Sequence, residues 1–205
     1  MNPSRKVFIN ISGTNATGKT TRVNYLVDWL KSNAKEVVPI LYLGKERGLL
    51  FKQVKDKTIA VLGVKDKSGR VVGWDSIGIN KIKDRIKFVE YVMQELNADI
   101  VIVEGYFNNR VLAYSPDKFS FPVEVIGIIF VYNSKEELQA RLRERNKGKG
   151  KGNVEKVWGY NKGFLSHLAK AREISTFDFR IEKELFNSPK EVLVEKYLKS
   201  LLVSW

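Results

Sequence analysis

Residues 13–20, Gly-Thr-Asn-Ala-Thr-Gly-Lys-Thr, fit the pattern G-x-x-x-x-G-K-[ST], whose residue types and spacing suit phosphate binding. The glycines let the loop curl so that successive backbone N–H groups point inward. Lys19 would then reach the outer phosphates, and the Thr20 hydroxyl would coordinate Mg²⁺. The pattern predicts a nucleoside triphosphate site, the tail of ATP in our assignment, formed by Gly13, Thr14, Asn15, Ala16, Thr17, Gly18, Lys19, Thr20 and Thr21.

The segments on either side of this loop supply the strand and the helix that the pattern needs. Residues 6–12 are mostly apolar and β-branched, as in a buried parallel strand. After the loop, apolar residues recur at helical spacing at Val23, Leu26, Val27 and Leu30. Because strand, loop and helix follow one another in the required order, chance is a poor explanation for the match.

Two carboxylates are candidates to act beside the loop. Residues 100–103 form an apolar run that ends in Glu104, as in a central parallel strand that delivers a carboxylate to the ligand-binding edge of a sheet. Asp75 follows another apolar run and precedes a helical stretch, which places it near the same edge. We assign Glu104 to Mg²⁺ and Asp75 as the base for an acceptor hydroxyl. The alternatives are that Glu104 is the base and that Asp75 caps a helix.

Three arginines, Arg141, Arg143 and Arg145, lie on a helix predicted to begin at a capping box formed by Ser134 and Glu137. Phosphoryl transfer requires that charge on the equatorial phosphate oxygens be neutralised, and we expect at least one of these arginines to do so. Their ordinary alternative is a solvent-exposed face with i,i+4 pairing to acids such as Glu137. Residues 146–152 alternate lysine with glycine, which predicts a mobile loop that closes as a lid.

The charge of the chain is strongly basic and unevenly distributed. The 36 Lys+Arg against 23 Asp+Glu give a net charge of +13, and residues 141–172 hold ten basic and only two acidic side chains. Such a segment, from Arg141 to Arg172, can hold a polyanion such as DNA by displacing its counterions. A solvated basic face is the alternative. Within it, Trp158, Tyr160 and Phe164 could stack on an unpaired base or form a helix core, and His167 is expected on the surface or lid.

The remaining pattern predicts alternating strands and helices. Strands are expected at residues 37–43, 58–64, 70–74, 123–132 and 177–181, with a loop at 44–48 and a β-hairpin or paired excursion around a turn at 65–69. Helices are expected from residue 79 to 96, in the second half of 154–172, and after a capping box at Ser188 and Glu191.

Length and composition are those of one domain of moderate size. We predict a single α/β domain over residues 1–205, with a mostly parallel sheet and helices on both faces. No apolar run suits a signal peptide or a membrane span, and there is no cysteine for disulfides or thiolate metal sites. These features predict an intracellular, cytoplasmic protein with no membrane partner.

The order of phosphate loop, acidic strand end at Glu104, arginine-bearing helix and Lys-Gly loop resembles that of nucleoside and nucleotide kinases of the P-loop superfamily. The resemblance implies a P-loop kinase domain that uses ATP and Mg²⁺, with a basic lid at about residues 141–172. The N/T-K-x-D guanine signature of GTPases is not found in a suitable place.

A narrower resemblance covers less than half of the chain. Residues 60–63, 72–76 and 101–105 are similar to phage P-loop kinases that phosphorylate 5-hydroxymethyluracil in DNA, although Val72 stands where those kinases have the first glycine of a Gly-Gly-x-Asp element. This resemblance implies that the acidic residues of that family correspond to Asp75 and Glu104. It also implies bacteriophage origin and location in the host cytoplasm.

Three functions remain open from the sequence. The first is an ATP-dependent kinase that acts on a hydroxyl of a nucleic acid, most specifically a hydroxymethyl pyrimidine in DNA, which must be extruded from a duplex. The second is a nucleoside or nucleotide kinase acting on free substrates. The third is a nucleic-acid-binding ATPase without an acceptor.

Overall fold

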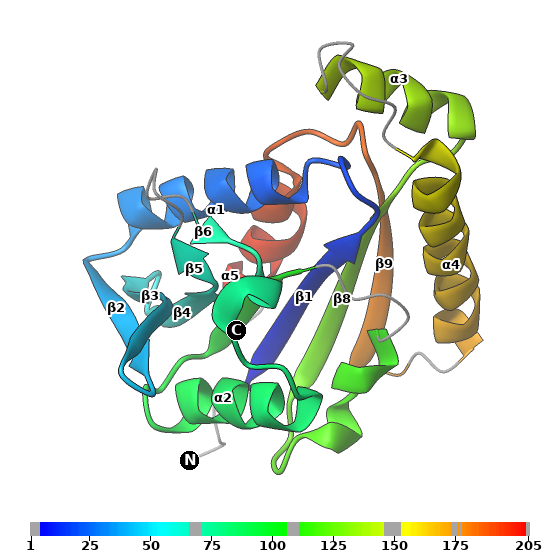
Figure 1. Cartoon of the computed structure of the whole chain (residues 1–205). Coiled ribbons are helices and arrows are strands. Elements are labelled where there is room, and N and C mark those ends of the chain that lie inside the picture. Colours follow the sequence, from blue (N-terminus) through cyan, green and yellow to red (C-terminus); the bar gives the residue numbers. More distant parts are fainter. Residues whose placement is uncertain are drawn as a thin grey trace.

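The fold is built on one seven-stranded, mostly parallel sheet (Figure 1). The computed structural model describes residues 5–65, 71–105, 111–145, 153–173, 176 and 178–203, without the side chains of 64, 65, 71, 72, 75, 76, 111, 112, 171 and 172. The sheet runs in the order β2 (Glu36–Tyr42), β3 (Lys45–Val54), β4 (Lys57–Leu62), β7 (Ile100–Glu104), β1 (Val7–Gly13), β8 (Glu124–Val131) and β9 (Phe179–Leu185). From β4 to β9 all neighbours are parallel, whereas β2 and β3 form an antiparallel edge.

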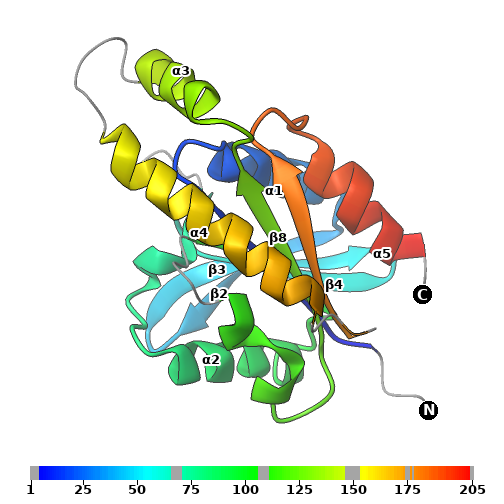
Figure 2. The ribbon, with the colours of Figure 1, turned by 90° about the vertical axis from the view of Figure 1, so that its right-hand side faces the viewer.

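Helices cover both faces of this sheet, as predicted (Figure 2). One face packs against α1 (Lys19–Asn33) and the C-terminal helix, made of π-helical η4 (Leu193–Leu198) and α5 (Lys199–Val203). The other packs against α2 (Ile82–Gln94) and α4 (Val154–Glu173). Because side chains alternate along a strand, Phe8 of β1 enters one core while Ile9 enters the other.

The local patterns around the glycine loop are confirmed. β1 and α1 flank the loop, and the four predicted apolar positions of α1, Val23, Leu26, Val27 and Leu30, are buried. β7 ends at Glu104, and β8 is buried along its whole length. The capping box of α3 (Lys135–Arg145) forms as predicted: the Glu137 amide donates to Ser134 Oγ at 3.2 Å, and the Ser134 amide donates to Glu137 Oε2 at 3.4 Å.

The predicted hairpin is confirmed as a small excursion outside the main sheet. β5 (Val64–Lys65) pairs in antiparallel fashion with β6 (Val71–Val72), while residues 66–70 lie outside the described part of the chain. β4, which precedes the hairpin, belongs to the main sheet instead. Three short 3₁₀ turns follow: η1 (Trp74–Ile77), η2 (Val111–Tyr114) and η3 (Pro116–Lys118).

The predicted loop at residues 44–48 is wrong, because most of it begins β3. Leu43 and Gly44 have φ values of 51° and 72° and form the two-residue turn that joins β2 to β3. Lys45 and its successors then pair with β2, and from Gly48 onward β3 also pairs with β4. Pairing with two neighbouring strands outweighs the polar, glycine-containing composition that suggested a loop.

The helix predicted only for the second half of 154–172 spans all of Val154–Glu173. Gly159 and Gly163 do not interrupt this helix. Burial of Phe164 and Leu168 in the core outweighs the low helix propensity of the two glycines. Phe164 is only 2% exposed, so it is a core residue and is not available to stack on a base.

Two glycine-to-alanine changes should have opposite effects on stability. A Cβ on Gly13, whose φ is +133°, would lie 2.1 Å from the Phe130 carbonyl oxygen, so Gly13→Ala should lower the free energy of unfolding by about 2 to 4 kcal/mol. A Cβ on Gly159 meets no atom within 4 Å, so Gly159→Ala should raise it by about 0.5 to 1 kcal/mol. Urea unfolding measures both, and a tolerated Gly13→Ala would contradict the close approach of β1 and β8.

Candidate functional site

The glycine loop (residues 13–19) lies at the carboxyl edge of the parallel strands, where β1 passes into α1. β1 has β7 on one side and β8 on the other, and the chain fills the β7 side before it crosses to β8. Such a reversal of strand order opens a crevice at the carboxyl ends of the strands, where open α/β sheets bind ligands. The loop is anchored to the sheet by the Thr14 amide, which donates to the Phe130 carbonyl at 3.0 Å.

Two side chains of the motif point to partners beside the loop. Lys19 is only 8% exposed, and its Nζ donates to the carbonyl oxygens of Gly13 and Thr14, both at 3.0 Å. The Thr20 hydroxyl donates to Glu104 Oε2 at 3.3 Å, which joins α1 to the end of β7. The predicted meeting of the motif with the carboxylate of the central strand therefore occurs.

A cavity of about 500 Å³ lies over this arrangement. It gathers most of the residues that sequence analysis singled out, together with Gly73. Its described lining comprises Asn15, Ala16, Gly18, Lys19, Thr20, Thr21, Gly73, Glu104, Arg141 and Arg145. The loop, the end of β7 and the arginine-bearing helix α3 therefore converge on one space.

The other predicted residues have different places. Gly13, Thr14 and Thr17 belong to the loop but are buried, and the Thr17 hydroxyl donates to the Thr14 carbonyl at 2.7 Å. Arg143 is exposed and is not among the described residues that line the cavity, since on a helix it points away from Arg141 and Arg145. The acid that pairs with Arg141 is Glu144, at 2.6 Å, and not Glu137.

Asp75 lies next to the cavity lining along the chain. It belongs to η1, which follows the cavity-lining residue Gly73, while its side chain lies outside the described part of the structure. Its neighbour Trp74 is fully buried and donates through Nε1 to the Tyr114 hydroxyl at 3.3 Å. Arg47 holds the other end of η1 through the Ile77 carbonyl.

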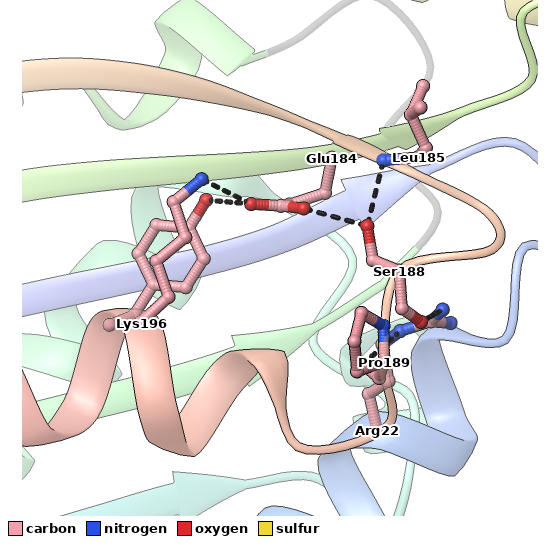
Figure 3. A network of polar contacts seen from close by, with 7 residues as sticks. Arg22, Glu184, Leu185, Ser188, Pro189 and Lys196 are labelled. Atoms are coloured by element: carbon pink, nitrogen blue, oxygen red, sulfur yellow. Dashed lines mark hydrogen bonds and ion pairs between the residues drawn. The ribbon is translucent and has the colours of Figure 1, made fainter.

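Sequence analysis missed Arg22, which supports the glycine loop from the α1 side. Its guanidinium donates to the Thr17 carbonyl at 2.7 Å and to the Phe186 carbonyl at 2.8 Å, and it also contacts the carbonyls of Ser188 and Pro189 (Figure 3). The side chain is 6% exposed and lies over the Phe130 ring. Burial lowers the pKa of Arg22, and Glu184 opposes that shift. The sequence signal that could have found Arg22 is its position: a charged residue one turn after Lys19, beside the apolar stripe of α1.

Glu184 of β9 organises the segment that Arg22 grips. Its carboxylate accepts from Ser188 Oγ at 2.8 Å, Tyr197 Oη at 2.7 Å and Lys196 Nζ at 2.5 Å (Figure 3). The capping box predicted at Ser188 is therefore wrong, because the Ser188 hydroxyl bonds to Glu184 and accepts from the Leu185 amide. Burial raises the pKa of Glu184, but the hydrogen bonds from Lys196, Tyr197 and Ser188 outweigh it, so the pKa is lowered overall.

A third contact region joins the loop to α3 and α4. Tyr132 and Leu142 form a small apolar cluster against which Ala16 of the loop and Trp158 of α4 pack. Trp158 is thus half-buried in a packing role, and burial raises the pKa of Tyr132 to about 12. Sequence analysis also missed Asn161, a fully buried polar residue of α4 that bonds to the loop.

The arrangement is suited to hold an anion with several charges. Lys19, Arg141 and Arg145 supply positive charge, and the start of α1 directs backbone N–H groups toward the same space. Within the described residues, no cluster of three or more His, Cys, Asp or Glu side chains forms a metal site. A cation bound here would need the Thr20–Glu104 oxygens together with oxygens of a ligand.

Comparison with known proteins adds no family assignment. No family model and no curated protein matches the chain. Among the described helices, none is long and apolar enough to cross a membrane.

Glu184→Gln should weaken the fold in a pH-dependent way. Because the folded-state pKa is lowered, the stabilisation is present above the ordinary glutamate pKa of about 4.3 and is lost as pH falls through the folded-state value. We expect the free energy of unfolding to fall by about 1 to 3 kcal/mol at pH 7, and this difference from wild type to shrink toward pH 3; urea unfolding measures both. Glu195→Gln, which removes an exposed pair with Lys199, is the control and should change little. Equal effects of the two variants would contradict the network.

Proposed function

We propose that the protein is an ATP- and Mg²⁺-dependent phosphotransferase of the P-loop kinase class, formed by a single domain over residues 1–205. The observation that carries this proposal is the cavity in which Lys19 and Thr20 of the motif meet Glu104 and two arginines. An ATPase needs the loop and the metal site. The additional cations from α3 favour a kinase, because they can neutralise charge in the transition state of phosphoryl transfer.

Each side chain of the cavity has a role in this proposal. The backbone N–H groups of the glycine loop and Lys19 hold the outer phosphates. Arg141 and Arg145 of α3 neutralise charge on the transferred phosphoryl group. The predicted lid over residues 141–172 does not include α4, because Phe164 and Leu168 pack that helix into the core. The oxygens of Thr20 and Glu104, 3.3 Å apart, fit Mg²⁺, which usually takes one or two protein oxygens and completes its shell with phosphate and water. When bound, the cation would supply further neutralisation of phosphate charge.

Asp75 is the base in this scheme. The Thr20 hydroxyl already engages Glu104 on the α1 side, and η1 reaches the cavity from the other face of the sheet through Gly73. Asp75 would accept the proton of the acceptor hydroxyl as its oxygen bonds to the γ-phosphorus. The bond between that phosphorus and the bridging oxygen breaks, and ADP leaves.

The acceptor we favour is a hydroxyl on a nucleic acid, most specifically the 5-hydroxymethyl group of hydroxymethyluracil in DNA. The support is electrostatic: Lys156, Lys162 and Lys170 are exposed along α4, on the same basic segment as the cavity arginines. A small free substrate does not need so extended a basic surface. A nucleoside or nucleotide kinase remains the second candidate, favoured by the two arginines that reach the phosphate cavity itself.

Lys19→Ala should lower the rate of phosphoryl transfer by at least about a hundredfold, while the protein still folds and unfolds cooperatively. The measurement is transfer of label from γ-labelled ATP to hydroxymethyluracil DNA, ordinary DNA and free nucleotides. Label on hydroxymethyluracil DNA supports the favoured acceptor, and label on nucleotides supports the second candidate. DNA-stimulated phosphate release without any labelled acceptor would leave only an ATPase.

Neutralising Lys156, Lys162 and Lys170 to glutamine should reduce the slope of log K against log salt for DNA binding by about two to three, because each phosphate contact contributes just under one. The matched control is Lys35, Lys45 and Lys55, which are also exposed but lie on the antiparallel edge strands or at their ends. Changing them to glutamine gives the same net charge and should leave the slope nearly unaltered. Equal slopes for the two triple variants would contradict a role of α4 in DNA binding.

A further inference from the structure

One buried amide joins α4 to the glycine loop. Asn161 is 0% exposed, and its Oδ1 accepts from Thr14 Oγ1 and from the Tyr132 amide, both at 2.8 Å. Its Nδ2 donates to the Tyr132 carbonyl at 3.0 Å. The two bonds to Tyr132 tie α4 to the end of β8, whereas the bond to Thr14 ties α4 to the glycine loop.

Thr14 transmits this contact to Lys19. Its amide donates to Phe130 at 3.0 Å, and its carbonyl accepts from Lys19 Nζ at 3.0 Å and from the Thr17 hydroxyl at 2.7 Å. The side chain of Thr14 is therefore held by Asn161 while its carbonyl holds the ammonium. A rotation of the Thr14 backbone away from Asn161 would turn the carbonyl and remove one of the two carbonyl contacts that orient Lys19.

Two further contacts near α4 reach the loop in the described part of the chain. The small apolar cluster touches the loop through Ala16, and the Tyr132 hydroxyl donates to the Asn15 carbonyl at a long 3.4 Å. The Asn161–Thr14 bond is shorter and shielded from water, where a hydrogen bond is electrostatically stronger.

We propose that Asn161 is a positioning residue: through Thr14 it sets the carbonyl that orients Lys19, and so prepares the loop for the outer phosphates of a nucleotide. The effect on nucleotide binding rests on the proposed function. The effect on the loop of the free protein does not, because all the atoms involved belong to the chain.

Thr14→Val tests the contact with the least damage. Valine has nearly the same shape but no hydroxyl, and Asn161 keeps both bonds to Tyr132 and remains satisfied. Thr14→Ser restores the hydroxyl and is the matched control. Amide hydrogen exchange in the free protein reports the loop through residue 14, which donates to Phe130, and the sheet through Gly105, which donates to the Ile11 carbonyl at 3.0 Å.

We expect Thr14→Val to lower the protection factor of amide 14 by about five- to tenfold and to leave that of Gly105 unchanged, with Thr14→Ser close to wild type. The dissociation constant of a non-hydrolysable ATP analogue should rise by a similar factor in the valine variant only. Asn161→Ala combined with Thr14→Val should weaken nucleotide binding less than the two separate effects together, because both remove the same contact.

Two results would overturn the positioning role: unchanged protection of amide 14 in Thr14→Val, or a serine variant as impaired as the valine one. Equal loss of protection at residue 14 and at Gly105 would also overturn it, because the hydroxyl would then support the whole fold. If the wild-type protein binds no nucleotide, the proposed function fails, and the exchange data still decide whether Asn161 holds the loop.

Discussion

The site depends on the orientation of two carbonyl oxygens, those of Gly13 and Thr14, which hold the ammonium of Lys19 at the mouth of the cavity. A carbonyl at the end of a strand is free to turn unless its peptide is fixed on both sides. Here α1 and α4, which cover opposite faces of the sheet, both grip the loop, the first through Arg22 and the second through Asn161. Side chains from both layers therefore preset the conformation of the loop.

This support has an electrostatic cost that an anion would relieve. Arg22 is buried, and after burial itself the positive charge of Arg141 contributes to lowering its pKa, against the opposing effect of Glu184. The cavity-lining cations Lys19, Arg141 and Arg145 add further positive charge in the same region. Like charges gathered in a partly desolvated space repel one another, so a ligand with several negative charges should bind there more strongly than at a comparable exposed surface. The charges around the cavity thus favour a multiply charged anion over a neutral ligand.

The parts that sequence analysis predicted correctly are local in the chain. Each depends mainly on residues close by in the sequence: the strand and helix that flank the glycine loop, the capping box of α3, and the apolar run that ends at Glu104. Arg22 and Asn161 escaped because their partners are distant: Asn161 bonds to Thr14 across 147 positions, and Arg22 to Ser188 across 166. β3 was misassigned for the same reason, since only its pairing with β2 and β4 makes a polar, glycine-containing segment a strand. A sequence pattern states what a segment prefers, and tertiary pairing decides what it does.

The sheet also separates Glu104 from η1, the turn that contains Asp75. Side chains alternate along β7, so Glu104 projects toward the same face as Ile100 and Ile102, which pack in the core beneath α1. η1 instead belongs to the opposite core through Trp74 and Ile77. A carboxylate on the α1 side is next to the Thr20 hydroxyl and suits a cation between phosphates. Strand parity therefore explains why Glu104 meets Thr20, whereas η1, the turn that contains Asp75, packs in the core on the other face of the sheet.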